Sequence, residues 1–313
     1  MNFEETLHHV LDACKLAGAS DADARISRAE GESVNIRDGK LEQIERNEDM
    51  GLALRCFFGR RQASASGSDL SKDGLNRLVE RCISMAKLAP EDPYAGLADE
   101  QLVSTDNPVF DLSGDTDHSV DLLTSDALEA EAAALQVSGV KQVSDCGAGW
   151  TRAERWLAAS NGFSSHKESG MSSIGLAVIA ERDGAMERDY ASRSSRRKSD
   201  RLSPTDIGLL AAQRTLKRLG PTKIESQLAP VIYDKRVSTS LLNAFINAIS
   251  GPAIARGVSF LKEHLGAKIF SDDINIIDDP FREYGHGTRG HDGEGLAVKK
   301  TKLIDNGQLN QWL

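Results

Sequence analysis

The feature that most restricts the fold of this sequence is a set of tight-turn signals between stretches with a two-residue period. Asp38-Gly39, Asn161-Gly162, Asp183-Gly184 and Asn306-Gly307 each separate two such stretches. Asn or Asp followed by Gly tolerates the positive φ angles that a two-residue hairpin turn requires. The clearest case is the first, where residues 33–37 and 41–46 form the two arms. The pattern therefore predicts antiparallel β-hairpins.

Apolar residues at helical spacing flank these hairpins in separate runs. The predicted helices are residues 3–16, 75–86, 120–135, 203–219, 238–249 and a further helix that ends at Leu265. Helices and strands do not alternate as they do in parallel α/β folds. Runs of helices and runs of hairpins indicate an α+β protein, with antiparallel sheets and flanking helices.

The length and one helix terminator predict two domains. The chain has 313 residues, more than the roughly 100–200 expected of one domain. Gly220-Pro221 ends a helix whose start is marked by Ser203-Pro204, so we place the boundary there, with domains at 1–220 and 221–313. Strands are expected at 230–233 and 296–304. Because the chain ends in the returning arm of a hairpin, we expect the second domain to be truncated.

Charge and cysteine usage favour a cytoplasmic protein without nucleic-acid or membrane partners. The 38 basic and 47 acidic residues give a net charge of −9, which repels phosphate backbones and anionic lipid. The four cysteines form no C-x-x-C pair, so we interpret them as buried reduced thiols. The acidic N-terminus does not resemble a signal peptide. One basic cluster lies in a segment rich in serine, and we expect it to be a solvated loop; its members are Arg193, Arg196, Arg197, Lys198 and Arg201.

Two patterns near the C-terminus invite a functional interpretation. Gly285 to Gly290 match G-x-G-x-x-G, but that motif binds dinucleotides only when a helix opens directly from it, and none is expected here. His286 and His291 lie in the same loop beside Asp292 and Glu294, which could form a zinc site. Histidines in glycine-rich loops are more often solvated, so this metal site stays an alternative.

Two separated motifs resemble the TldD/PmbA family of metallopeptidases. The first runs from Asp38-Gly39 through Gly51–Arg55 to Ser64–Ser66. The second is Asp292-Gly293-Glu294-Gly295, a D-x-E-G motif, followed by the segment from Leu303 to Leu309. Their order and spacing extend the resemblance over nearly the whole chain, and in detail it is strongest for the PmbA, or TldE, branch. Asp292, Glu294 and Gly295 are thus expected to be family-motif or substrate-channel residues.

The resemblance implies a cytosolic TldD–TldE heterodimer that degrades unfolded peptides and trims the leader of a modified microcin. Its TldD subunit binds zinc through H-E-x-x-x-H and a distant Cys. Aligned on the preceding Leu-Leu pair, that motif falls on Asn243, Ala244 and Ala248, which can neither ligate zinc nor transfer a proton. The resemblance therefore predicts no catalytic residue, cofactor or zinc in this chain, and zinc in a TldD-like partner. Residues 241, 242, 245, 246 and 249 are expected to form a core face of that helix.

The leading hypothesis is a non-catalytic subunit that shapes peptide access, either paired with TldD or forming a homodimer in isolation. Two alternatives remain open. One is a self-sufficient hydrolase with zinc at His286 and His291. The other is a regulator of DNA gyrase, which an older label of the family suggests.

Overall fold

The computed structural model describes residues 2–103, 108–115 and 118–313. The chain forms two compact units, one of residues 1–221 and 289–297 and the other of residues 222–288 and 298–313. Residues 289–297, which follow most of the second unit in sequence, thus belong to the first unit.

The first unit is built on a six-stranded antiparallel sheet with the strand order β3-β2-β1-β4-β5-β6. Its strands are β1 (Asp21–Arg37), β2 (Lys40–Phe58), β3 (Arg61–Gly67), β4 (Val140–Ala159), β5 (Ser164–Arg182) and β6 (Ala185–Ser195). Two hairpin turns have the expected geometry, with positive φ at Asp38 and Gly39 and at Asp183 and Gly184. The antiparallel sheets and flanking helices confirm the predicted α+β class.

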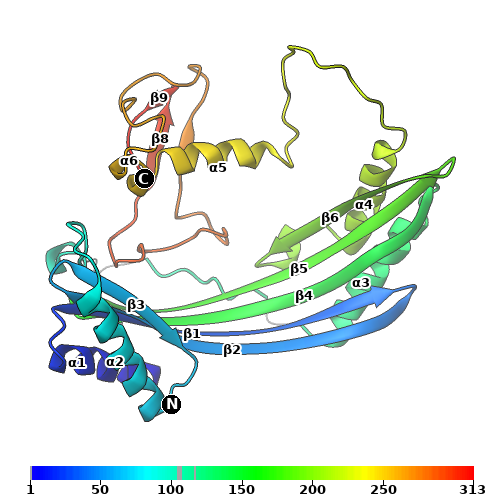
Figure 1. Cartoon of the computed structure of the whole chain (residues 1–313). Coiled ribbons are helices and arrows are strands. Elements are labelled where there is room, and N and C mark those ends of the chain that lie inside the picture. The colour runs from blue at the N-terminus through cyan, green and yellow to red at the C-terminus, as the bar shows by residue number, and fades with distance from the viewer. Residues whose placement is uncertain (1, 104–107, 116–117) are drawn as a thin grey trace. The chain divides into compact units, whose positions relative to one another are not determined.

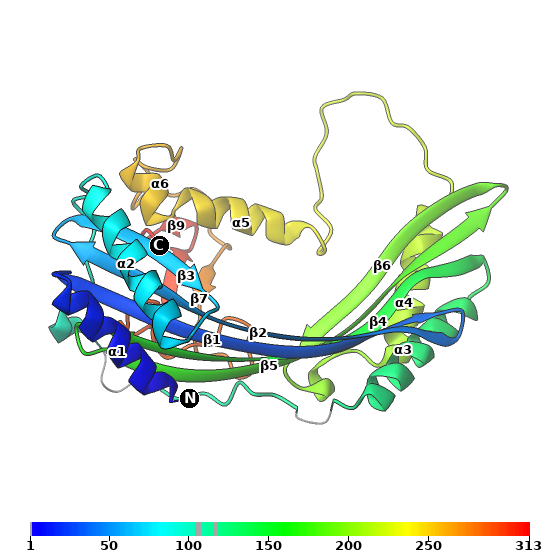
Figure 2. The same ribbon diagram turned by 60° about the horizontal axis from the view of Figure 1, so that its bottom comes forward.

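Two pairs of helices cover opposite ends of one face of this sheet (Figure 2). They are α1 (Phe3–Leu16) with α2 (Lys72–Leu88), and α3 (Val120–Leu135) with α4 (Pro204–Arg218). Side chains on alternate residues of β1 enter both cores: Ala24 and Ile26 pack with α1 and α2, and Val34 and Ile36 pack with α3 and α4. Each pair of helices thus buries one end of the same strand. Two short 3₁₀ helices, Glu100–Leu102 and Lys198–Asp200, lie in the connections.

The second unit contains α5 (Ser238–Ala248), α6 (Gly251–Ala255), β7 (Ile276–Asp278), β8 (Thr301–Asp305) and β9 (Gln308–Leu309). The three strands form an antiparallel sheet in the order β7-β8-β9. Its small core contains Phe245, Ala248, Ile249, Leu261, Leu303, Ile304 and Leu309.

Several predicted elements of the second unit were wrong. Residues 230–233 are not a strand; Val231 and Ile232 are exposed and pair with no described strand, and a β-branched run without a partner gains nothing from an extended conformation. The helix expected to end at Leu265 stops at Ala255, because Gly257 has φ +68°. The strand expected over 296–304 is limited to 301–305.

The predicted core face of α5 is correct only for its C-terminal half. Phe245 and Ile249 are buried, whereas Leu241 and Leu242 are 50% and 42% exposed. The small core of the second unit contacts the last turns of the helix and leaves the first turns uncovered.

The prediction that the basic cluster is a solvated loop was wrong for two of its members. Arg196 is only 6% exposed and donates hydrogen bonds to the backbone oxygens of Leu112 and Gly170, both at 3.0 Å. Arg201 pairs with the buried Asp126 on α3. These guanidinium groups hold segments of the fold together instead of presenting a cationic surface.

The four cysteines are free and buried, as expected. The Cys146 thiol donates to the backbone oxygen of Ala127 at 3.2 Å. Burial, followed by the nearby Glu131 and Asp145, raises the pKa of this thiol from 9.0 to about 12. The folded chain therefore holds this proton more tightly than the unfolded chain does.

This shift predicts a loss of stability in alkali. The contribution of the protonated Cys146 thiol to the free energy of unfolding is fully present below pH 9.0. It is lost as the pH rises toward about 12, because only the thiol of the unfolded chain ionises in that window. Between pH 9 and about pH 10, the free energy of unfolding should fall by about 1 kcal/mol more than in Cys146→Ser, as urea denaturation would measure. Equal losses in the two proteins would contradict the prediction.

Candidate functional site

The D-x-E-G motif forms a loop that is fixed to the sheet of the first unit. The Arg55 guanidinium on β2 donates to the Glu294 carboxylate at 2.8 Å and also pairs with Asp23, its register partner on β1. Burial lowers the pKa of Arg55, but the hydrogen bonds that Arg55 donates to Asp23 and Glu294 outweigh it and raise that pKa overall. Burial also raises the pKa of the Asp23 carboxyl, although Arg55 opposes this. The contact between Arg55 and Glu294 thus joins two residues that are 239 positions apart in sequence.

The other motif residues shape the loop itself. The Asp292 carboxylate accepts hydrogen bonds from the backbone N–H groups of Glu294 and Leu296, both at 2.9 Å. Gly295 has φ +86°, and a Cβ there would lie 2.5 Å from Cγ of Phe163. These contacts give Asp292, Glu294 and Gly295 loop-forming positions beside a cavity.

Gly295→Ala should therefore be costly, whereas Gly293→Ala should not. Alanine at 295 meets both a left-handed backbone and the Phe163 ring, which together cost roughly 2–3 kcal/mol. A Cβ at 293 has nothing within 4 Å. Denaturant unfolding of both variants provides the measurement, and amide exchange of residues 289–297 shows whether the loop opens. Similar stability of the two variants would disprove the packing argument.

A cavity of about 690 Å³ lies next to this loop. It is bordered by residues 108–113, by the first residues of β5 and by residues 289–291. Phe163 contacts the His291 ring edge-on, with 4.9 Å between ring centroids, and the Nδ1 of His291 lies 2.7 Å from the backbone oxygen of Asp292. The volume is in the usual range for a ligand pocket.

Charge is unequally distributed around this cavity. Lys167 on β5 is partly buried, and its pKa is lowered by burial and by the nearby Arg196, Arg155 and Arg289. On the other face of the same strand lie His166 and Glu168. The cavity thus has a cationic side and an acidic side.

One group of potential metal ligands occurs among the described residues, namely Glu154, His166 and Glu168. Glu154 and Glu168 are register partners, and His166 stacks on Trp156 with 4.6 Å between ring centroids. Arg152 already pairs with Glu168 at 2.9 Å, so a cation would have to displace it. Neither His286, which is exposed in the second unit, nor His291 belongs to this group.

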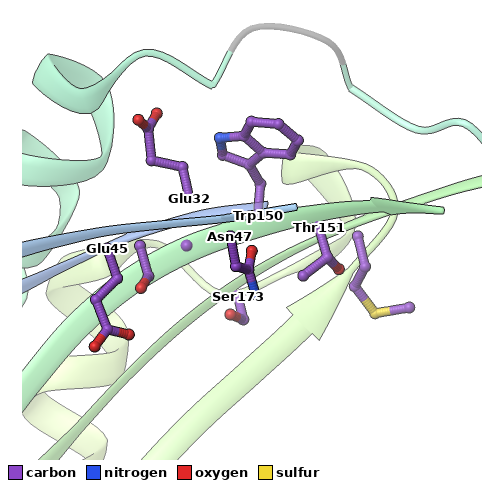
Figure 3. Close-up of a pocket in the computed structure, with 9 residues that line it drawn as sticks. Glu32, Glu45, Asn47, Trp150, Thr151 and Ser173 are labelled. Carbon is purple, nitrogen blue, oxygen red and sulfur yellow. The ribbon is translucent and has the colours of Figure 1, made fainter. Parts of the chain in front are cut away.

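A second, smaller hollow of about 160 Å³ lies in the middle of the sheet (Figure 3). Glu45, Thr151 and Ser173 project from one face, and Glu32 and Trp150 project from the other. The hollow exists because Gly149 has no side chain: a Cβ there would lie 2.9 Å from Cβ of Ser33. Most of the residues that line it are polar, but Trp150 and Met171 also border it.

Sequence models of one family match the chain in three consecutive segments. They are described as domain 1, the central domain and the C-terminal domain of the PmbA/TldA metallopeptidases and match residues 22–86, 114–219 and 226–313. The metalloprotease PmbA of Escherichia coli O157:H7 is 35% identical over 309 residues, which cover 97% of this chain and 68% of that protein. This chain belongs to the PmbA/TldD family.

Further relatives agree with this assignment and confirm the resemblance found in the sequence. The PmbA homologue of Haemophilus influenzae is 31% identical over 95% of this chain and 66% of its own length. A candidate modulator of DNA gyrase from Bacteroides thetaiotaomicron has the same fold, with a TM-score of 0.90 at 24% identity over 99% of this chain and 71% of that one. TldE from Thermococcus kodakarensis gives a TM-score of 0.79 at 17% identity over 98% of this chain and 69% of its own.

The positions where the family resemblance places a zinc motif lie on α5. Asn243 and Ala244 are exposed, and Ala248 is buried in the core of the second unit. No residue of α5 is His, Cys, Asp or Glu. The G-x-G-x-x-G pattern at 285–290 lies in turns, and no helix opens from it. Among the described residues, no helix is long and apolar enough to cross a membrane.

Sequence reasoning missed the roles of three residues in or near the cavity, although Arg55 lies in the first family motif and Arg196 in the basic cluster. The roles of Arg55, Phe163 and Arg196 have no local signal, because each side chain contacts a segment far away in sequence. The alternation of β5 could have shown that His166 and Glu168 share a face.

Proposed function

We propose that this chain is the TldE-type subunit of a TldD–TldE zinc metallopeptidase, and that it shapes peptide access without holding the zinc. The observation that supports this role is the composition of α5. Where the resemblance places H-E-x-x-x-H, this helix has Asn243, Ala244 and Ala248. An amide and two methyl groups cannot replace two imidazoles and a carboxylate as ligands and base.

Exposed apolar side chains on α5 and in the segment before it support the proposal that this chain binds a partner subunit. Ile224, Leu228, Val231 and Ile232 are each at least 74% exposed, and Leu241 and Leu242 follow on the helix. Apolar surface of this kind marks protein interaction sites. A DNA-directed role gains no comparable support, because Arg196 and Arg201 are used inside the fold.

Metal analysis of a reconstituted complex tests the assignment. This chain and a TldD-type subunit are co-purified, separated, and analysed for zinc. We expect about one zinc in the TldD-type subunit and none retained by this chain after dialysis, because α5 has no ligand. Stoichiometric zinc in this chain that is lost in His286→Ala or His291→Ala would instead establish the loop site.

A further inference from the structure

Three of the four cysteines meet in one core of the first unit, between the sheet and a pair of helices. Cys14 lies on α1, Cys56 on β2 and Cys82 on α2, and all three are fully buried in the same hydrophobic cluster. The two helices lie side by side over this end of the sheet (Figure 1). The fourth cysteine, Cys146, belongs to the other core, so it is a matched control within the same chain.

The thiols of Cys14 and Cys56 are in direct contact. Their Sγ atoms lie 3.4 Å apart, although the residues are 42 positions apart in sequence. A disulfide bond is about 2.0 Å long, so an approach of about 1.4 Å would bring the two sulfurs to bonding distance. Small apolar side chains could fill the same space, and packing alone therefore does not require two oxidisable groups here.

The backbone holds this contact in place. The N–H of Ala19 donates to the oxygen of Cys14 at 3.0 Å, which closes the end of α1. The next residue, Ser20, donates to the oxygen of Phe57 at 2.9 Å and so joins the same turn to β2 beside Cys56. A disulfide at this position would join two segments that the native fold already places together.

The third thiol of the cluster is used differently. The Cys82 thiol donates to the backbone oxygens of Ala63 at 3.3 Å and of Leu54 at 3.6 Å, so it is hydrogen-bonded to the sheet. Hydrogen bonding with Cys14, then with Cys82, and burial raise the pKa of the Cys56 thiol. Cys56 therefore keeps its proton until a partner sulfur becomes electrophilic.

Cys14 is the thiol of this cluster that an oxidant reaches first. It lies in the last turn of α1, two residues before Leu16, which is 89% exposed. Local opening of a helix end costs much less free energy than global unfolding, and the opening of one turn uncovers Cys14 without disturbing the sheet. Cys56 stays covered, because β2 lies between β1 and β3.

We propose that Cys14 and Cys56 are a modification site, at which hydrogen peroxide forms an intramolecular disulfide that locks α1 to the sheet. The Cys14 thiolate attacks one peroxide oxygen, an S–O bond forms, the O–O bond breaks, and the released hydroxide takes the thiol proton to give water. The Cys56 sulfur then attacks the sulfur of this sulfenic acid. The S–S bond forms, the S–O bond breaks, and the hydroxide leaves with the Cys56 proton as a second water.

Two thiols thus give two electrons to one peroxide molecule. The proposal is independent of the proposed function, because none of its residues lies on α5.

Mass spectrometry of the peroxide-treated full chain tests the proposal. The folded chain is treated with hydrogen peroxide, the free thiols are alkylated, and the digest is analysed without reductant. We expect two of the four thiols to be lost and the peptides that contain Cys14 and Cys56 to be linked, until dithiothreitol separates them. Cys82→Ala and Cys146→Ala should keep this link, whereas Cys14→Ala and Cys56→Ala should lose it.

The chain unfolded in urea shows what oxidation gives without the native contact. Shorter loops close at a smaller entropic cost, and Cys56 and Cys82 are only 26 positions apart. The unfolded chain should therefore link Cys56 to Cys82 more often than to Cys14, whereas the folded chain should link Cys56 to Cys14.

The locking of α1 is measured on the purified oxidised chain. A disulfide that fits the native fold restricts the unfolded chain, so oxidation should raise the Tm by roughly 5–10 °C and reduction should reverse this rise. The amides of residues 10–17 should also exchange more slowly in the oxidised chain, because the last turn of α1 can no longer open freely.

The thiol map of the wild-type chain decides the question even where a variant fails to fold. Retention of all four thiols by the folded chain, sulfinic acid without a linked pair, a link from Cys56 to Cys82, or a link between two chains would each overturn the site. An unchanged Tm and unchanged amide exchange with the bond formed would overturn the locking of α1.

Discussion

A mixture of this chain with a TldD-type subunit is expected to hydrolyse an unstructured peptide at least about 100-fold faster than this chain alone. General-base catalysis contributes roughly 10²–10⁴-fold, and Ala244 offers no base at the aligned position. A metal that activates water adds a further large factor, and α5 offers it no ligand. This chain alone should therefore show only background cleavage.

The assay compares each subunit with the mixture, with and without a chelator. A useful variant of this chain is Asn243→His, Ala244→Glu and Ala248→His, which restores two ligands and the base but not the distant Cys. It should gain weak metal affinity at most, because structural and catalytic zinc sites need at least three protein ligands. Cleavage by the unmodified chain at the rate of the mixture, abolished by chelation, would show that this chain is itself a peptidase.

The turns and helix starts that were predicted correctly are formed by interactions between residues close in sequence. The hairpin at Asp38-Gly39 and the N-cap at Ser203, which accepts from Asp206 N–H, depend on residues close in sequence. The long strand β4 has glycines in its middle, at 147 and 149, where local propensity alone favours a break in the strand. There the pairing of both neighbouring strands overrides the weak local preference.

The site was less predictable because long-range contacts build it. The sequence marked Glu294 and His291, but their partners are distant in sequence: Arg55 lies on β2 and Phe163 in the turn between β4 and β5. Burial of a charged group is equally invisible to local patterns. Arg196 sits among serines and other arginines, where solvation is the natural expectation, and only the approach of residue 112 to β5 explains its burial.

Replacing Asp126 by alanine is expected to lower the free energy of unfolding by about 3–5 kcal/mol. Asp126 is buried on α3 and binds Arg201 at 2.8 Å and Lys198 at 3.0 Å. The Arg201 side chain is only 5% exposed, so it would remain buried without its counter-ion. One of its nitrogens, Nη1, already has no hydrogen-bond partner, and the loss of Asp126 would add a second unsatisfied group.

The matched control for this variant is Lys198→Ala. It removes the other partner of the same carboxylate, but Lys198 is 45% exposed and water can replace much of its interaction. Exposed ion pairs contribute about 0–1 kcal/mol, so this variant should be nearly as stable as the parent chain. Urea unfolding followed by circular dichroism measures both. If the two variants lose equal stability, the buried Asp126–Arg201 pair does not hold the β6–α4 connection to α3, and the burial of Arg201 must be compensated by other groups.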